Sequence, residues 1–132
     1  MQCEYWGRIR SAVCELLSSR VLAFGHAVDV ADALVETSLL GMDTRGVGLP
    51  STYLKELKSG RANRSPLFEV RGRYAAAGVF YADNALGVVA ANAATREAIK
   101  RAKETGIAAL AVADSNHFGA AGYYARMGAC EI

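Results

Sequence analysis

The sequence is poor in cysteine, in net charge and in long apolar runs, and each shortage excludes a class of protein. Its three cysteines, Cys3, Cys14 and Cys130, lie far apart and form no Cys-x-x-Cys pair, so we expect neither a disulfide framework nor a metal site. A net charge of +2 is too small to indicate a nucleic-acid partner. The apolar runs are shorter than a bilayer's span and the first residues lack the pattern of a secretory signal, so a cytoplasmic location without membrane attachment is expected.

The usual nucleotide fingerprints are also missing. There is no G-x-G-x-x-G and no phosphate-loop lysine motif anywhere in the chain. What is present is a chain of 132 residues, 52% hydrophobic and 21% charged, which is typical of a globular domain long enough to bury a core.

The first half of the chain has helical periodicity. Apolar residues recur every three or four positions from Tyr5 to Ser19 and from Ala27 to Leu40, and Gly41 suits the left-handed position after the second segment. Pro50 is placed to start a third, shorter helix that ends before Gly60. These segments predict a layer of three helices.

A polar stretch from Arg61 to Pro66 separates this periodicity from a different pattern. We therefore expect an N-terminal helical segment over residues 1–62 and an α/β segment over residues 63–132. Several basic residues lie around the boundary, and a solvated face is the simplest interpretation of them: Lys55, Lys58, Arg61, Arg64, Arg71 and Arg73.

The second half predicts strands joined by a helix. Residues 67–71 and 76–81 are expected to be strands with a tight connection at Gly72-Arg73, and Asp83 with Asn84 is expected to cap the next helix. That helix spans Gly87 to Thr105, with a stripe of small residues facing the sheet. The stripe comprises Val88, Ala91, Thr95, Ala98 and Ala102. The fold class is therefore α/β (α+β).

One apolar stretch, Ile107 to Ala113, predicts a strand buried on both faces, and polar residues follow it at once. His117 would then lie on a loop at the carboxyl edge of the sheet, where ligands of open α/β sheets bind. A helix starting near Gly122 would turn its backbone N–H groups toward the same loop and could hold an anion. His117 is a candidate general acid or base, and the alternative is a loop histidine bonded to its own turn.

Three ordered blocks of sequence carry a resemblance to a known family: Leu34–Val47 (LVETSLLGMDTRGV), Asp83–Ala91 (DNALGVVAA) and Lys103–Ala125 (KETGIAALAVADSNHFGAAGYYA). Together they make the chain resemble the N-terminal part of the type-2 malate/L-lactate dehydrogenase family. The resemblance implies an oxidoreductase that uses NAD or NADP, bound by a fold that is not of the Rossmann type. It also implies a small 2-oxo or 2-hydroxy acid as substrate and a homodimer in the full-length form.

The resemblance also assigns roles to particular residues. His117 matches a histidine in the family's Asn-His-Phe-Gly block that transfers protons in some members. The backbone that follows matches a segment in contact with the dinucleotide, and it comprises His117, Phe118, Gly119, Ala120 and Ala121.

A second block departs from the family pattern. Where members usually have Asp-Ser/Thr-His-Gly-Val, this chain has Asp43-Thr44-Arg45-Gly46-Val47, so Thr44 and Arg45 occupy positions that the resemblance makes catalytic. Arginine does not release its proton at ordinary pH, so Arg45 cannot replace that histidine as a proton donor. Two interpretations remain open: Arg45 binds the substrate carboxylate, or the position is no longer under selection.

Family enzymes are much longer than this chain, which stops inside an expected helix at Glu131-Ile132. We therefore expect a fragment or a truncated gene product. Two functions remain open: part of a dehydrogenase that transfers hydride between NAD(P) and a small 2-oxo acid, or a non-catalytic remnant that acts at most as an interaction module.

Overall fold

The computed structural model describes residues 2–19 and 21–131 and divides the chain into two compact units, Met1–Ser65 and Pro66–Ile132. The division lies just beyond the expected boundary after residue 62. Residue 1, where the first expected segment begins, and residue 132, where the second ends, lie outside the described residues. None of the described helices is long and apolar enough to cross a membrane.

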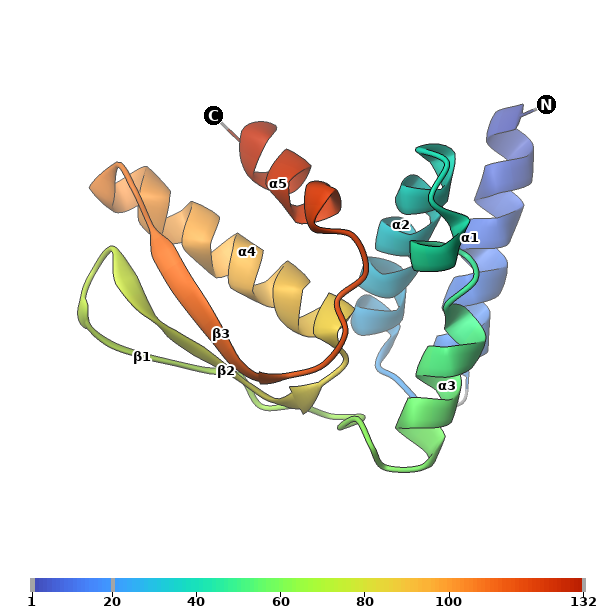
Figure 1. Ribbon diagram of the computed structural model, residues 1–132, viewed down its shortest axis with the longest axis horizontal. Helices are drawn as coiled ribbons and strands as arrows, with labels where there is room; N and C mark the ends of the chain where they lie inside the picture. The colour runs from blue at the N-terminus through green and yellow to red at the C-terminus, as the bar shows by residue number, and fades with distance from the viewer. Residues whose placement is uncertain (1, 20, 132) are drawn as a thin grey trace. The chain divides into compact units, whose positions relative to one another are not determined.

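The first unit consists of helices. Its elements are α1 (Gln2–Ser18), α2 (Phe24–Leu39), a short 3-10 helix η1 (Asp43–Arg45) and α3 (Pro50–Lys58) (Figure 1). Helix α1 packs on both α2 and α3. Apolar side chains that repeat at helical spacing form the core, among them Leu17, Val30, Leu34, Tyr53 and Leu57. Gly41 and Gly60, with φ of 83° and 76°, follow α2 and α3 in the left-handed conformation that the sequence predicts for such positions.

The second unit is a three-stranded mixed sheet with two helices. Strands β1 (Glu69–Tyr74), β2 (Ala77–Ala85) and β3 (Ala109–Ser115) lie in that order, with β1 antiparallel and β3 parallel to β2. Helix α4 (Gly87–Thr105) connects the parallel strands along one face of the sheet, and α5 (Ala121–Ala129) follows β3 (Figure 1). The core contains Phe80, Ala82, Ala85, Ala90 and Ala94. The predicted α/β class is confirmed.

The connection between the first two strands differs from the prediction. Gly72 and Arg73 lie inside β1, and the chain turns between Tyr74 and Ala77 instead. The β1–β2 register shifts between Arg71 and Tyr74, and a Cβ on Gly72 would lie 2.6 Å from the Ala77 carbonyl oxygen. This glycine therefore permits a close approach of two backbones at an irregular pair, which in sequence looks the same as a turn.

Helix α4 turns a different row of small residues toward the sheet than the stripe expected from sequence. Ala90 and Ala94 share the core cluster with Phe80, which packs on Phe68 at a ring-centroid distance of 5.2 Å. The predicted residues Ala91, Thr95 and Ala98 instead line an open space beside β3. Of the predicted stripe only Val88 is buried, and composition alone did not single out the contact row because α4 carries alanines on more than one side, at positions 90, 91, 93, 94, 98 and 102.

The expectation that strand β3 is buried on both faces was also wrong. Most of its residues are exposed, with Val112 at 44%, and Ile107 just before the strand is 72% exposed. The strand is at one end of the sheet order and pairs only with β2. An apolar run shows that a strand is suited to burial, but it does not show which elements of the described chain cover it.

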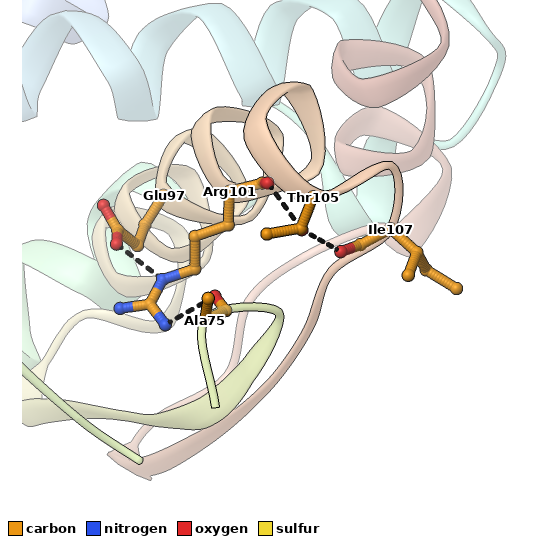
Figure 2. A network of polar contacts seen from close by, with 5 residues as sticks. All are labelled: Ala75, Glu97, Arg101, Thr105 and Ile107. Carbon is orange, nitrogen blue, oxygen red and sulfur yellow. Dashed lines mark hydrogen bonds and ion pairs between the residues drawn. The ribbon is translucent and has the colours of Figure 1, made fainter. Parts of the chain in front are cut away.

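A polar network holds the edge of the unit where the parallel strands begin (Figure 2). Arg101 donates through Nε to Glu97 Oε1 at 2.7 Å and through Nη1 to the Ala75 carbonyl at 3.2 Å. The Thr105 hydroxyl is 2.8 Å from the Arg101 carbonyl oxygen and 2.7 Å from that of Ile107. These contacts tie the end of α4 to the segments that enter β2 and β3, and they leave the opposite edge for the loop that carries His117.

Candidate active site

The carboxyl ends of β2 and β3 meet at one edge of the sheet, and the backbone there has an unusual conformation. Pairing between the two strands is irregular between Tyr81 and Ala85. Asp83 and Asn84 in β2 and Asp114 in β3 have φ of 51°, 54° and 55°, and they are the described non-glycine residues with positive φ. Left-handed backbone is costly for most side chains but is tolerated by Asp and Asn, and such residues often cluster at functional sites.

Asp83 and Asn84 do not cap helix α4 as the sequence suggested. The N-cap position is Leu86, which provides no side-chain hydrogen bond. Asp83 instead accepts a hydrogen bond at Oδ2 from the Leu67 backbone N–H at 2.9 Å, and Asn84 accepts from the side chain of Asn116. Both side chains therefore join separate segments at the sheet edge.

Asn116 connects the loop after β3 to the end of β2. Its Nδ2 lies 3.0 Å from Asn84 Oδ1, 3.3 Å from the Asn84 carbonyl oxygen and 2.8 Å from that of Ala85. On the other side, the peptide between Asn116 and His117 lies against Gly87 at the start of α4. A Cβ on Gly87 would overlap the carbonyl oxygens of both residues. The loop is thus located by backbone contacts from two elements.

The five residues expected to contact a dinucleotide form one continuous segment between β3 and α5. His117 and Phe118 are exposed, while Gly119 is buried with φ of 79°. Ala120 is the N-cap of α5 in extended conformation, and Ala121 is the first helical residue. Ala120 provides no side-chain cap, and the N–H groups of the first turn face the segment, where that of Tyr123 bonds to the Ala120 carbonyl at 3.2 Å.

A space of about 550 Å³ adjoins the loop within the second unit. Tyr124 of α5 donates its hydroxyl to the Phe118 carbonyl at 2.5 Å, and the two rings lie 5.6 Å apart. The walls are mainly apolar, from Ala91, Ala98, Leu110 and Val112, and Asp114 and Asn116 add polar groups at the loop. Apolar walls with a few polar groups are typical of small-molecule sites.

Thr44 and Arg45 belong to the first unit, in the short helix η1, and both are exposed. The turn that carries them is fixed on α2. Gly46 is buried, and a Cβ there would overlap Ser38 Oγ. Ser38 Oγ also accepts a hydrogen bond from the Val47 N–H at 3.0 Å. The candidate residues therefore form two groups, the turn at 44–45 and the loop at 117–121, each described within its own unit.

Two of the basic residues near the boundary, Arg64 and Arg71, have structural partners. Arg64 donates to the carbonyls of Leu57 and Lys58 at 2.8 and 3.1 Å, at the C-terminal end of α3. Arg71 donates two hydrogen bonds to the carboxylate of Glu69 at 2.8 and 2.7 Å, and these bonds lower the pKa of Glu69 below its usual value. Within residues 2–19 and 21–131, no group of three or more His, Cys, Asp or Glu side chains is placed to hold a metal.

Sequence reasoning located the loop but missed the residues that hold it, namely Asn84, Gly87 and Asn116. Asn84 and Asn116 each follow an apolar strand run, and asparagine is one of the few residues that tolerate left-handed backbone. That shared position after neighbouring strands was the available signal.

Several known proteins with similar sequences and structures are dehydrogenases. The family model described as malate/L-lactate dehydrogenase matches residues 6–131. The malate/(S)-sulfolactate dehydrogenase of Methanothermus fervidus is 32% identical over 118 residues, which are 89% of this chain and 35% of that protein. The NAD(+)-dependent ureidoglycolate dehydrogenase of Escherichia coli is 29% identical over 91% of this chain and 36% of that protein.

The solved structure of malate dehydrogenase from Pyrococcus horikoshii superimposes with a TM-score of 0.92 at 34% identity, covering 96% of this chain and 36% of that one. The chain thus spans about a third of the length of the relatives that it matches. The matched residues cover most of both units and the whole loop at 117–121. This chain therefore belongs to the malate/L-lactate dehydrogenase family.

Proposed function

We propose that the chain supplies part of an oxidoreductase that interconverts a small 2-oxo acid and the corresponding 2-hydroxy acid. In the reductive direction the carbonyl carbon gains a hydride and the carbonyl oxygen gains a proton. The observation that carries the proposal is the loop with His117, which lies at the carboxyl edge of parallel strands and leads directly into the N-terminus of α5.

The segment from His117 to Ala121 fits a dinucleotide, either NAD or NADP. The N-cap residue of α5, Ala120, makes no side-chain cap bond, and N–H groups at a helix start suit the negative charge of a pyrophosphate. A Cβ on Gly122 would meet nothing within 4 Å, so there is room beside these donors. A bound nicotinamide would supply or accept the hydride.

The imidazole of His117 is proposed to give a proton to the substrate oxygen or to take it back. Histidine suits both directions because its ordinary pKa lies near neutral pH. His117 is exposed at the loop, where a substrate can reach it.

Arg45, with Thr44 beside it, is proposed to bind the substrate. A guanidinium presents paired N–H donors that match the two oxygens of a carboxylate, and the Thr44 hydroxyl can add a further hydrogen bond. Both residues are exposed on a turn that packing on α2 holds in place. The proposal extends to a homodimer working in the cytoplasm.

The test is a chimera in which residues 6–131 replace the matching part of the Pyrococcus horikoshii malate dehydrogenase. Oxidation of NADH and NADPH is followed with a panel of 2-oxo acids. We expect turnover with at least one of them, and His117→Ala should lower it by about two to four powers of ten, as loss of a general acid does. The matched control is His26→Gln in α2, the other histidine of the chain, which should leave turnover unchanged. An inactive but folded chimera, or full turnover in His117→Ala, would contradict the proposal.

A further inference from the structure

We infer that Asn116 is a positioning residue for His117. Its side chain joins the loop after β3 to the end of β2. Gly87 contributes by letting the same loop lie against α4. The functional meaning of this inference rests on the role proposed above for His117. The connection from the Asn116 side chain to the end of β2, called the tether below, rests on geometry alone.

The first part of the argument is the set of acceptors around one side chain. The Asn116 amide nitrogen lies within 3.3 Å of three oxygens, and two of them are backbone carbonyls of Asn84 and Ala85. The last backbone pair between the strands is Ala85 with Ser115. Asn116 therefore continues the connection one residue beyond the sheet, immediately before His117.

The second part is the backbone conformation at both ends of this connection. Asn84 has φ of 54°, and both its carbonyl oxygen and its Oδ1 accept from Asn116. Asp114, with φ of 55°, lies two residues before Asn116 in β3. Left-handed backbone persists where its surroundings hold it, and at Asn84 the hydrogen bonds from Asn116 provide that support.

The third part is the packing of the loop on α4. The atoms that a Cβ on Gly87 would overlap belong to the Asn116 and His117 backbone, so no change of side-chain rotamer could relieve the clash. Any larger residue at position 87 must push the peptide between Asn116 and His117 away from the helix. Because His117 is exposed, its place depends on this peptide rather than on burial of its ring.

Four variants separate these contributions. Asn116→Asp keeps the shape but, when ionised, turns an acceptor toward three acceptor oxygens, and Asn116→Ala removes the side chain beyond Cβ. Asn84→Ala removes one acceptor of three and leaves both carbonyls. Gly87→Ala displaces the loop without changing any side chain that bonds to it. The matched control is Gly128→Ala in α5, where a Cβ would meet nothing within 4 Å.

The readout is the ring Cε1–H resonance of His117 in the NMR spectrum of the 132-residue chain without ligand. The chain has two histidines, so His26 in the helical unit is an internal reference. In Asn116→Asp, Asn116→Ala and Gly87→Ala we expect the His117 resonance to move toward its position in the urea-unfolded chain, with a smaller shift in Asn84→Ala. The His26 resonance should stay in place in all four, and Gly128→Ala should move neither. A merely structural role for Asn116 would not give this selective change.

An unchanged His117 resonance in both Gly87→Ala and Asn116→Asp would overturn the inference. So would an unmodified chain whose His117 resonance already coincides with that of the unfolded protein. If Asn116→Asp also moves the His26 resonance, the variant has unfolded, and Asn84→Ala is then the deciding variant. An unchanged His117 resonance in Asn84→Ala overturns the inference, and a shift of His117 without a shift of His26 supports it. Adding NADH to the unmodified chain tests the proposed function separately. A His117 resonance that ignores NADH but moves in these variants would weaken that function and leave the tether standing.

Discussion

Replacing Gly46 by alanine should loosen the turn that carries Thr44 and Arg45. Gly46 is buried against α2, where an added Cβ would overlap Ser38 Oγ and would lie 2.8 Å from the Leu34 carbonyl oxygen. The Leu34 oxygen belongs to the backbone of a packed helix and has little freedom to move. We therefore expect Gly46→Ala to push the turn away from α2.

The cost has two parts. Overpacking in a buried site costs about 1–3 kcal/mol. The hydrogen bond of 3.0 Å from the Val47 N–H to Ser38 Oγ would also lengthen or break, which costs roughly 0.5–1.5 kcal/mol. The sum is about 1.5–4.5 kcal/mol, and for a unit of this size such a loss lowers the melting temperature by on the order of 6–36 °C.

Thermal unfolding followed by the fluorescence of Trp6 would measure this change, because the single tryptophan of the chain lies in α1 of the same unit. Ser38→Ala isolates the hydrogen bond and should lower the melting temperature by only about 5 °C. Gly25→Ala in α2 is the control, since a Cβ there would meet nothing within 4 Å. Equal melting temperatures for Gly46→Ala and Gly25→Ala would refute the reasoning.

Three further predictions concern the substrate, pH and self-association. In the chimera, Arg45→His should raise KM for the 2-oxo acid about ten- to a hundredfold, because one charge-assisted hydrogen-bonded pair is lost; Arg73→His is the control. Higher turnover with an unchanged KM would show instead that Arg45 does not bind the substrate and that the position is no longer under selection. Burial, and secondarily the charge of Glu56, raises the pKa of Tyr53. The melting temperature of the first unit should therefore be unaffected by this group below about pH 10 and should fall as the pH rises further, and Tyr53→Phe should abolish that fall. The chain should self-associate through the exposed strand β3, and Val112→Lys should reduce the association in sedimentation; a monomer at all concentrations would exclude this.

The sequence predicted the elements best where both ends of an element have a local signal. Helix α4 has the predicted bounds, Gly87 to Thr105, because Gly106 ends it in a left-handed conformation, with φ of 83°. Gly72 misled the prediction of the hairpin because a glycine can serve a turn or a close backbone approach, and only the partner strand distinguishes the two. The wrong prediction that β3 is buried on both faces has a similar cause, because an apolar run does not show which elements lie beside the strand.

The site shows the same division. The position of His117 on a loop after a strand could be predicted from the local change from apolar to polar residues. The tether could not, because Asn116 and the acceptors Asn84 and Ala85 lie more than thirty residues apart and become neighbours only when β3 pairs with β2. The catalytic role of His117 stays a prediction.

The mixed topology of the sheet implies an order in which the second unit becomes structured. Strands β1 and β2 are joined by a short turn, so their antiparallel pairing closes a small loop, whereas β3 can pair with β2 only after the whole of α4 has been placed between them. Loop closure costs more entropy as the connection grows, which makes the hairpin the earlier event. The loop at 117–121 depends on both strand ends, and it is also the later part of the unit to be synthesised. We therefore expect substitutions in the hairpin to slow folding, and substitutions at Asn116 mainly to speed unfolding.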